Sequence, residues 1–191
     1  EPGEFTLRIE ILDMFGSTSK TELYEQPIKI EAAQQTVTIS QPQIVAAFRQ
    51  SEDLCPMCKS GYELLPYIKS YISGDMKSLA FYGEVYGTQT FFGESKPFVI
   101  RAMIMDKNGQ ELSKYSQQWR GTSAQVVPIL RTLDIKDLDD GEYQLRVEVR
   151  DRENKVIQYT EKKINRAGFR ENTSQSDELN ASLPAYFLSF Q

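Results

Sequence analysis

An eleven-residue segment occurs twice in this chain. Gly3-Glu-Phe-Thr-Leu-Arg-Ile-Glu-Ile-Leu-Asp13 recurs 138 positions later as Gly141-Glu-Tyr-Gln-Leu-Arg-Val-Glu-Val-Arg-Asp151, with six positions identical and three exchanging Phe for Tyr or Ile for Val. Both copies alternate apolar and polar residues, which is typical of a β-strand with one face in a core and one in water. A turn and a second strand follow each copy. The repeat therefore predicts two copies of one β-hairpin.

The second copy closes a series of strands that predicts a complete immunoglobulin-like β-sandwich over residues 62–165. The series has the regular spacing of short strands found in such sandwiches. The seven strands are expected at 62–68, 79–86, 98–105, 112–119, 126–133, 143–149 and 156–164. Only two residues precede the first copy, so residues 1–50 are predicted to be the C-terminal part of an earlier sandwich. The predicted fold class is all-β, with tandem immunoglobulin-like sandwiches of which the first is incomplete.

The segments outside the second sandwich are assigned by composition. Residues 51–61 are polar and turn-rich and predict an interdomain linker, and residues 166–191 predict a polar tail with an apolar end. We expect that apolar end to belong with a downstream domain. The first hairpin has an apolar face that we expect residues 37–48 to cover, while a partner chain adds a strand to its sheet edge. That face consists of Phe5, Leu7, Ile9 and Ile11.

Alternation also predicts which side chains of the second copy are buried. Arg146 and Glu148 are expected to face outward into water, and Tyr143 fits either a tyrosine corner or plain core packing. Three tight turns are expected, at 106–109, at 139–141 and at 151–154, because turn-forming Asp, Asn or Gly residues occur there between apolar stretches. The side chains expected to face the core are Tyr143, Leu145, Val147 and Val149.

Several short motifs follow one known pattern. Lys59-Ser-Gly61 precedes Pro66, Phe81-Tyr-Gly-Glu-Val-Tyr86 follows, and Thr38-Ile-Ser-Gln-Pro42 lies upstream. Together with the repeated strand they resemble the GWxTD-domain family, cell-envelope proteins found largely in Bacteroidetes, although the aspartate expected near Ser40 is missing. The Gly-Trp-x-Thr-Asp motif is absent, since the only Trp is Trp119 in Gln-Trp-Arg-Gly. The resemblance spans about residues 1–165 and implies the β-rich forepart of an exported bacterial protein, periplasmic or cell-surface, with no established catalytic activity.

Charge and composition exclude several classes of function. The net charge of -5 and the scattered basic residues argue against a nucleic-acid partner. No stretch approaches the roughly 20 apolar residues of a membrane-spanning helix. The chain contains no His, which removes His-based catalytic triads and most metal sites. We therefore expect no catalytic residues, no metal and no cofactor.

Cys55 and Cys58 form the only C-x-x-C motif. Zinc needs about four ligands and the chain has no other Cys, so an intramolecular zinc site is not expected. A local disulfide, or two free thiols in a loop, is the main interpretation, with redox chemistry or an intermolecular metal as alternatives.

Acidic residues offer two further candidates. Glu84 is expected on a solvated strand face. An acidic cluster around the 138–141 turn could hold Ca²⁺, but its spacing matches no recognised calcium loop, and turn chemistry is favoured. The cluster consists of Asp134, Asp137, Asp139 and Asp140.

Aromatic residues remain as candidates for a ligand or partner surface. Each of them could equally fill the core, and for Trp119 core packing is favoured. We expect a non-enzymatic scaffold or protein-interaction module, with a protein partner or neighbouring domain. A carbohydrate-binding module is the alternative, and a row of exposed rings would favour it. The candidate surface residues are Tyr82, Tyr86, Phe91, Phe92 and Trp119.

Overall fold

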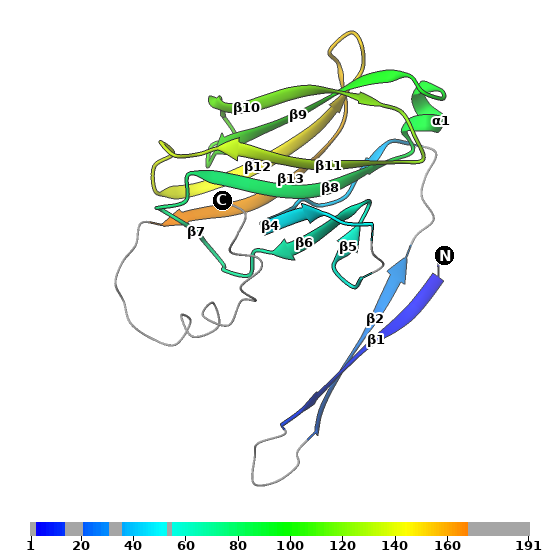
Figure 1. Ribbon diagram of the computed structural model, residues 1–191, viewed down its shortest axis with the longest axis vertical. Coiled ribbons are helices and arrows are strands. Elements are labelled where there is room, and N and C mark those ends of the chain that lie inside the picture. Colours follow the sequence, from blue (N-terminus) through cyan, green and yellow to red (C-terminus); the bar gives the residue numbers. More distant parts are fainter. Residues whose placement is uncertain (1–2, 14–20, 31–35, 53–54, 168–191) are drawn as a thin grey trace. The chain divides into compact units, whose positions relative to one another are not determined.

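The computed structural model describes residues 3–13, 21–30, 36–52 and 55–167. The chain divides into two compact units, Glu1–Gln34 and Gln35–Gln191. Nearly all of their regular structure is strand, so the predicted all-β class is confirmed (Figure 1). The predicted tail lies outside the described residues from residue 168 onward.

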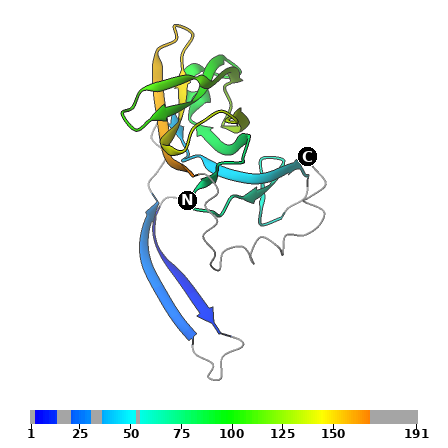
Figure 2. The ribbon, with the colours of Figure 1, turned by 90° about the vertical axis from the view of Figure 1, so that its left-hand side faces the viewer.

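The first unit is a two-stranded antiparallel ribbon, which we call the N-terminal ribbon. β1 (Gly3–Leu12) pairs with β2 (Thr21–Ile30) in a register that sets Gly3 opposite Ile30 and Leu12 opposite Thr21. Figure 2 shows the two strands running alongside each other and twisting along their length. The predicted first hairpin is therefore present.

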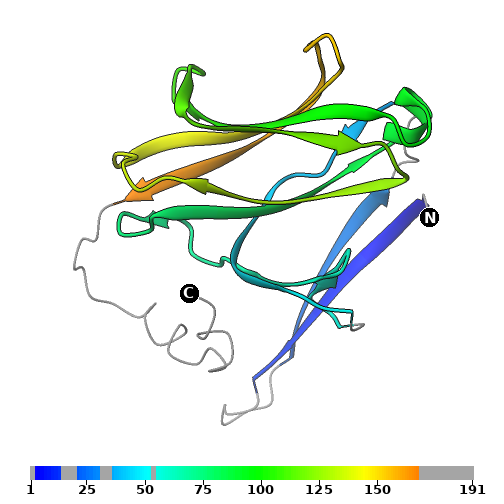
Figure 3. The ribbon, with the colours of Figure 1, turned by 45° about the horizontal axis from the view of Figure 1, so that its top comes forward.

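The second unit is a β-sandwich of two sheets (Figure 3). One sheet has the strand order β10-β9-β12-β13-β7, and the other has the order β11-β8-β4-β6-β5 with β3 paired to β8. All seven predicted strands are present, as β6 and as β8 to β13. One short helix, α1, follows β8. The bounds are β3 Thr38–Ile39, β4 Gln43–Gln50, β5 Cys58–Lys59, β6 Tyr62–Pro66, β7 Ile72–Ser73, β8 Ser78–Tyr86, α1 Thr88–Phe92, β9 Pro97–Asp106, β10 Glu111–Thr122, β11 Val126–Asp134, β12 Gly141–Arg150 and β13 Val156–Ala167.

The main core lies between the two sheets. Phe81 of β8 and Ile129 of β11 face Phe98 of β9 and Leu145 of β12, and all four side chains are fully buried. Alternate residues of β8, β9 and β12 contribute to this layer, as expected for two packed sheets. The alternation seen in the sequence therefore determines which face of each strand is inside.

The predicted boundary between the two units is wrong. β3 and β4 pair with β8 and β6, so residues 36–50 belong to the sandwich and not to the first hairpin. Residues 51–61, expected to be a linker, instead lead into the hairpin of β5 and β6. Val37 and Ile44 are buried in the sandwich core, which means that they are not available to cover the ribbon.

The second copy of the repeat, β12, is a central strand. Leu145, Val147 and Val149 are buried as predicted, and Tyr143 is half-buried against the core. The Tyr143 hydroxyl donates to the carbonyl oxygen of Asp139 at 3.1 Å. A tyrosine at this corner whose hydroxyl bonds to backbone a few residues upstream is a tyrosine corner. The structure therefore favours that alternative.

Glu148 is buried, contrary to prediction, although it does lie on the outward face of β12. Only 3% of its side chain is exposed, because Arg146 and Arg150 enclose it. Arg146 Nε lies 2.8 Å from Glu148 Oε1, and Arg150 Nε lies 2.7 Å from Oε2. Arg146 also lies 3.9 Å from the centre of the Tyr159 ring. Alternation gives the direction of a side chain, but long neighbouring side chains decide whether water reaches it.

Candidate functional site

The N-terminal ribbon has one strongly apolar face. In an antiparallel pair, residues directly opposite each other lie on the same face, so Phe5 faces the same side as Ile28, and Ile9 the same side as Tyr24. The large apolar side chains of this face are each about half exposed, from 38% for Ile28 to 61% for Ile11. They are Phe5, Leu7, Ile9, Ile11, Tyr24, Ile28 and Ile30.

The other face of the ribbon is mainly polar. Arg8 Nη2 lies 2.6 Å from Glu25 Oε1 across the two strands, and Glu4 is opposite Lys29. Leu12 and Leu23 add two apolar side chains near the far end of this face. The ribbon is therefore amphipathic, with one face suited to a core and the other suited to water.

The repeat shows what covers this type of strand elsewhere in the chain. β12 is paired on both sides, with β13 and with β9, and its apolar face packs against the opposite sheet. Among the described residues, β1 pairs with β2 alone. Two strands with six of eleven identical residues therefore differ in their surroundings. β12 has a neighbouring strand on each edge and a covered apolar face. Among the described residues, β1 has one neighbouring strand and a half-exposed apolar face.

The predicted aromatic candidates are not gathered on one surface. Phe92 stacks on Phe98 with the ring centres 5.3 Å apart and belongs to the core. Trp119 is half-buried against the core, and the Arg131 guanidinium lies 4.9 Å from the centre of its ring. Of the pair on α1, Phe91 is exposed, at 48%. A row of exposed rings, the arrangement expected for a sugar-stacking surface, is not formed by these residues.

Tyr82 and Tyr86 belong to a hydrogen-bonded cluster, here called the Glu84 cluster. The hydroxyls of Tyr82 and Tyr86 both donate to the Glu84 carboxylate, which also accepts from Ser60 at 3.2 Å. Burial, together with the Glu84 charge, raises the pKa of both tyrosines to about 12. Burial alone would raise the pKa of Glu84, but the three hydrogen bonds hold it below its ordinary value.

The Glu84 cluster corrects two expectations. Tyr82 is only 3% exposed, because it packs with Val45 and Leu64 in a second small core on the outer side of β8. Glu84 is half-buried rather than solvated. The cluster attaches the turn of the β5–β6 hairpin to β8, so its evident role is structural.

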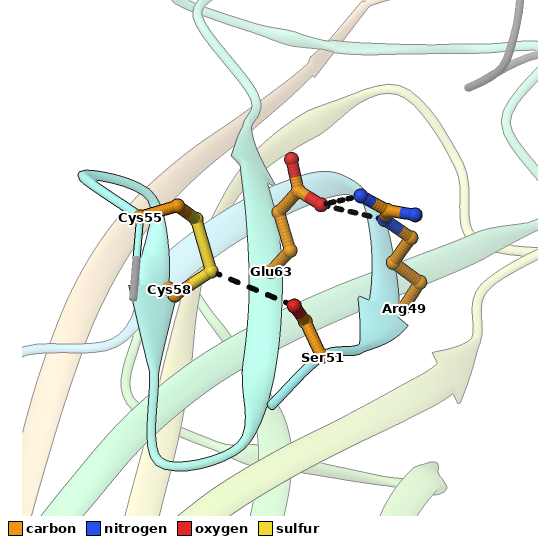
Figure 4. Close-up of a disulfide and its surroundings, with 5 residues drawn as sticks. All are labelled: Arg49, Ser51, Cys55, Cys58 and Glu63. Carbon is orange, nitrogen blue, oxygen red and sulfur yellow. Dashed lines mark hydrogen bonds and ion pairs between the residues drawn. A yellow bond between two sulfur atoms is a disulfide. The ribbon is translucent and has the colours of Figure 1, made fainter. Parts of the chain in front are cut away.

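The C-x-x-C motif forms a disulfide at the start of the β5–β6 hairpin (Figure 4). The Cα atoms of Cys55 and Cys58 are 5.0 Å apart, and Ser51 Oγ lies 3.8 Å from Cys58 Sγ. Beside it, Arg49 Nε donates to Glu63 Oε2 at 2.5 Å. Of the interpretations offered for the motif, the local disulfide is the one that the structure shows.

The acidic residues near the 138–141 turn do not gather around a common point. Asp137 pairs with Lys114 at 2.7 Å, and the Asp134 carboxylate pairs with Lys136 at 3.9 Å. Within the part of the chain that the structure describes, no group of three or more acidic, Cys or His side chains could hold a metal ion. The calcium interpretation is therefore not supported.

Sequence reasoning missed a cavity of about 300 Å³ in the sandwich, bounded by β4 and β6 of one sheet and by β7 and β13 of the other. We call it the lysine–tyrosine groove. The sequence carried no local signal for it, because its residues come from segments far apart in the chain. Its distinctive lining residues are Tyr67, Lys69, Tyr71, Lys162 and Lys163.

Comparisons with known proteins give only distant similarity. No family model matches this sequence, and a search of curated proteins finds no match. Among solved structures, a glycosyl hydrolase family 2 member from Bacteroides cellulosilyticus is similar, with a TM-score of 0.37 and 11% identity over 69% of this chain. The extracellular domain assigned to a hybrid two component system, BT3049, from B. thetaiotaomicron gives a TM-score of 0.29 and 12% identity over 66% of this chain. This chain spans 15% of the length of each.

No helix in the described residues has both the length and the apolar character needed to cross a membrane.

Proposed function

We propose that this chain is a non-enzymatic interaction module of an exported bacterial protein, and that the N-terminal ribbon is its contact surface. The observation that carries the proposal is the large apolar face of the ribbon, together with an edge of β1 that has no partner strand among the described residues. Exposed apolar patches and open strand edges are characteristic of protein-interaction sites.

The ribbon leaves considerable hydrophobic stabilisation unrealised. Complete burial of a large apolar side chain contributes about 1.5–3 kcal/mol, and the seven side chains of the apolar face are about half exposed. Covering them would contribute on the order of 5–10 kcal/mol. A two-stranded hairpin alone is at best marginally stable in water, so the ribbon gains most from a partner that covers this face.

The repeat indicates the kind of partner. In β12 the equivalent strand is completed by an antiparallel neighbour, β9, and by the inner face of a second sheet. The partner of the ribbon is accordingly a β-domain with an open edge and an apolar sheet face. The ribbon would complete that domain as β12 and β13 complete the sandwich here.

Two observations support a location outside the cytoplasm and a non-catalytic role. The Cys55–Cys58 disulfide suits an oxidising compartment. The chain contains no His, and its most perturbed titratable groups, those of the Glu84 cluster, are used to attach one hairpin to β8. The resemblance to GWxTD-domain proteins is consistent with a bacterial cell envelope, periplasmic or cell-surface.

A pull-down from bacterial envelope extracts tests the proposal with matched variants. Ile9→Lys places a charge on the apolar face of β1, and Thr6→Lys places the same charge on the polar face of the same strand. We expect the unaltered chain and Thr6→Lys to capture the same β-domain protein and Ile9→Lys to lose it. Equal capture by all three proteins would show that the ribbon is not the contact surface.

Hydrogen exchange in the captured complex provides an internal reference. The amides of β1 and β12 have similar intrinsic exchange rates because their sequences are so alike. In the isolated chain we expect β1 to exchange at least about a hundredfold faster than β12. In the complex the exchange of β1 should slow toward that of β12. Equal protection in the isolated chain would refute an open ribbon.

A further inference from the structure

The lysine–tyrosine groove combines cationic, aromatic and neutral polar groups around an apolar floor. Ile44, Ile72 and Ile164 line it from three different strands, and all three side chains are buried. The backbone elements on both sides belong to the sandwich, so the walls are regular strands and one short connection, residues 67–71. A site built on strands in this way is preformed and needs little ordering to bind a ligand.

Among the described residues, the lysines that line the groove form no ion pair. In the described part of the chain, no ion pair or hydrogen bond involves the side-chain amine of Lys69, Lys162 or Lys163. No Asp or Glu lines the groove. By contrast, Arg101 pairs with Glu111, and Lys114 pairs with Asp137. Lys69 lies close enough to Asp75 to lower the pKa of that carboxyl, whereas Lys162 lies opposite the buried Leu145, on the inward face of β13. In a chain with a net charge of -5, lysines without an ion pair beside one cavity favour an anionic ligand.

The two tyrosines provide fixed aromatic surface at the same place. The Tyr67 hydroxyl donates to the carbonyl oxygen of Tyr71 at 3.0 Å, which fixes the Tyr67 side chain in the loop. Burial raises the pKa of Tyr67, so this hydroxyl stays neutral and keeps its hydrogen bond to Tyr71. Tyr71 is 40% exposed. An aromatic ring that is partly open to water provides a surface on which the apolar face of a sugar ring can stack.

Neutral hydrogen-bonding groups complete the lining. Gln43, Ser70 and Asn165 also line the groove, and neutral backbone and side-chain groups can both donate to and accept from sugar hydroxyls. A hydrophobic anion alone would leave these groups without partners. The combination of unpaired ammonium groups, tyrosine rings and neutral polar groups matches a sugar that carries a negative charge.

We propose that the lysine–tyrosine groove binds an acidic saccharide, a sugar that carries a carboxylate or sulfate group. The anionic group interacts with Lys162 and Lys69, and the ring stacks on tyrosine. A volume of about 300 Å³ is at the lower end for small-molecule sites, which fits one or two sugar rings better than an extended acidic peptide. This site is separate from the N-terminal ribbon and does not depend on the function proposed for it.

Titration of the intact chain with short saccharides tests the proposal. The probes are digalacturonate, a sulfated disaccharide of matched length, neutral digalactose and a pentaglutamate peptide, followed by calorimetry and by amide NMR shifts. We expect one or both anionic sugars to bind at millimolar concentration or more tightly, to shift the amides of Tyr71 and Lys162, and to bind more weakly as salt increases. Comparison of the two anionic sugars shows whether carboxylate or sulfate is preferred.

Matched variants assign the binding to the groove. Lys162→Gln should weaken binding about two- to fivefold, and Tyr71→Ala about three- to tenfold. Lys155→Gln is the control, because it removes the same charge from the opposite end of β13, just before Val156. Equal binding of neutral digalactose, equal or tighter binding of pentaglutamate, no binding of either anionic sugar, or equal effects of the two lysine variants would each overturn the proposal.

Discussion

Replacing Glu148 by Ala tests how strongly the outer face of β12 is held together. Its carboxylate bridges Arg146 and Arg150, at 2.8 Å and 2.7 Å. The two arginine side chains are 23% and 15% exposed. Removing the carboxylate leaves two neighbouring guanidinium groups that repel each other and have lost their shared partner.

The expected cost follows from the contacts that remain. Breaking a buried ion pair by removing one partner costs about 3–5 kcal/mol. Arg146 keeps Glu161 at 3.1 Å, and Arg150 keeps the carbonyl oxygen of Asn154 at 3.1 Å. These contacts, and the partial access of water to both arginines, reduce the expected loss in free energy of unfolding to about 2–3 kcal/mol. For a unit of this size the melting temperature should fall by about 5–10 °C.

Urea unfolding followed by fluorescence measures this loss directly, because Trp119 is the only tryptophan and lies against the core. Glu142→Ala is the matched control, since Glu142 is exposed on the same strand and its removal should change stability by less than about 0.5 kcal/mol. A loss below about 1 kcal/mol for Glu148→Ala would show that the pair behaves as a solvated surface pair. The argument from burial would then be wrong.

The other predictions concern the disulfide, alkaline pH and one glycine. Cys58→Ser should lower the free energy of unfolding by up to about 2 kcal/mol, because the disulfide closes a short loop; denaturation with and without reductant measures this. Since the folded-state pKa of both tyrosines in the Glu84 cluster is raised from 10.0 to about 12, their stabilisation is complete below about pH 10 and is lost as pH rises toward 12. Glu84→Gln should shift this loss to lower pH, as seen in alkaline unfolding monitored by tyrosinate absorbance. Gly87→Ala should cost about 2–4 kcal/mol in thermal unfolding, because φ is 75° and the new Cβ would lie 2.6 Å from the carbonyl oxygen of Thr36. Gly109→Ala, at a φ of 78° with no atom within 4 Å of the new Cβ, should cost about 1 kcal/mol.

The strands of the sandwich were predictable because local signals agree with the fold. Alternation gives the buried face, and the turns carry their own chemistry. Asp106 Oδ1 accepts backbone N–H groups of Asn108 and Gln110, both at 2.8 Å. Asp151 Oδ1 accepts from residues 153 and 155 in the same way. Both turns were expected from sequence, since Asp at the first position of such a turn binds its own backbone.

The boundary between the two units was not predictable by the same reasoning, and neither was the burial of the Glu84 cluster. β8 is buried on both faces, with Phe81 in the main core and Tyr82 in the second one. A rule that assigns one face of a strand to water therefore placed Tyr82 and Glu84 outside. The second core exists because β4, β5 and β6 curl over the outer side of β8, and no local pattern in residues 43–66 indicates that curvature.

The lysine–tyrosine groove could not be predicted from the pattern within single strands. The groove requires residues 67–71 to lie beside residues 162–165, and this proximity arises from the parallel pairing of β7 with β13. Alternation within one strand cannot reveal a parallel pair that is formed by two residues on each side. The residues of the groove therefore became visible only when the two sheets were placed together.

The strands of the N-terminal ribbon could be predicted because the sequence pattern of β1 occurs a second time in the chain, in β12. β1 and β12 share a sequence pattern that specifies a strand with one apolar face, and both fold as that strand. Local sequence thus determines the strand and the hairpin, while the neighbours β9 and β8 determine whether the apolar face is buried. β12 buries its apolar face against such neighbours, whereas β1, in the part of the chain that the structure describes, pairs with β2 alone. The same strand pattern therefore has a covered apolar face in β12 and a half-exposed one in β1.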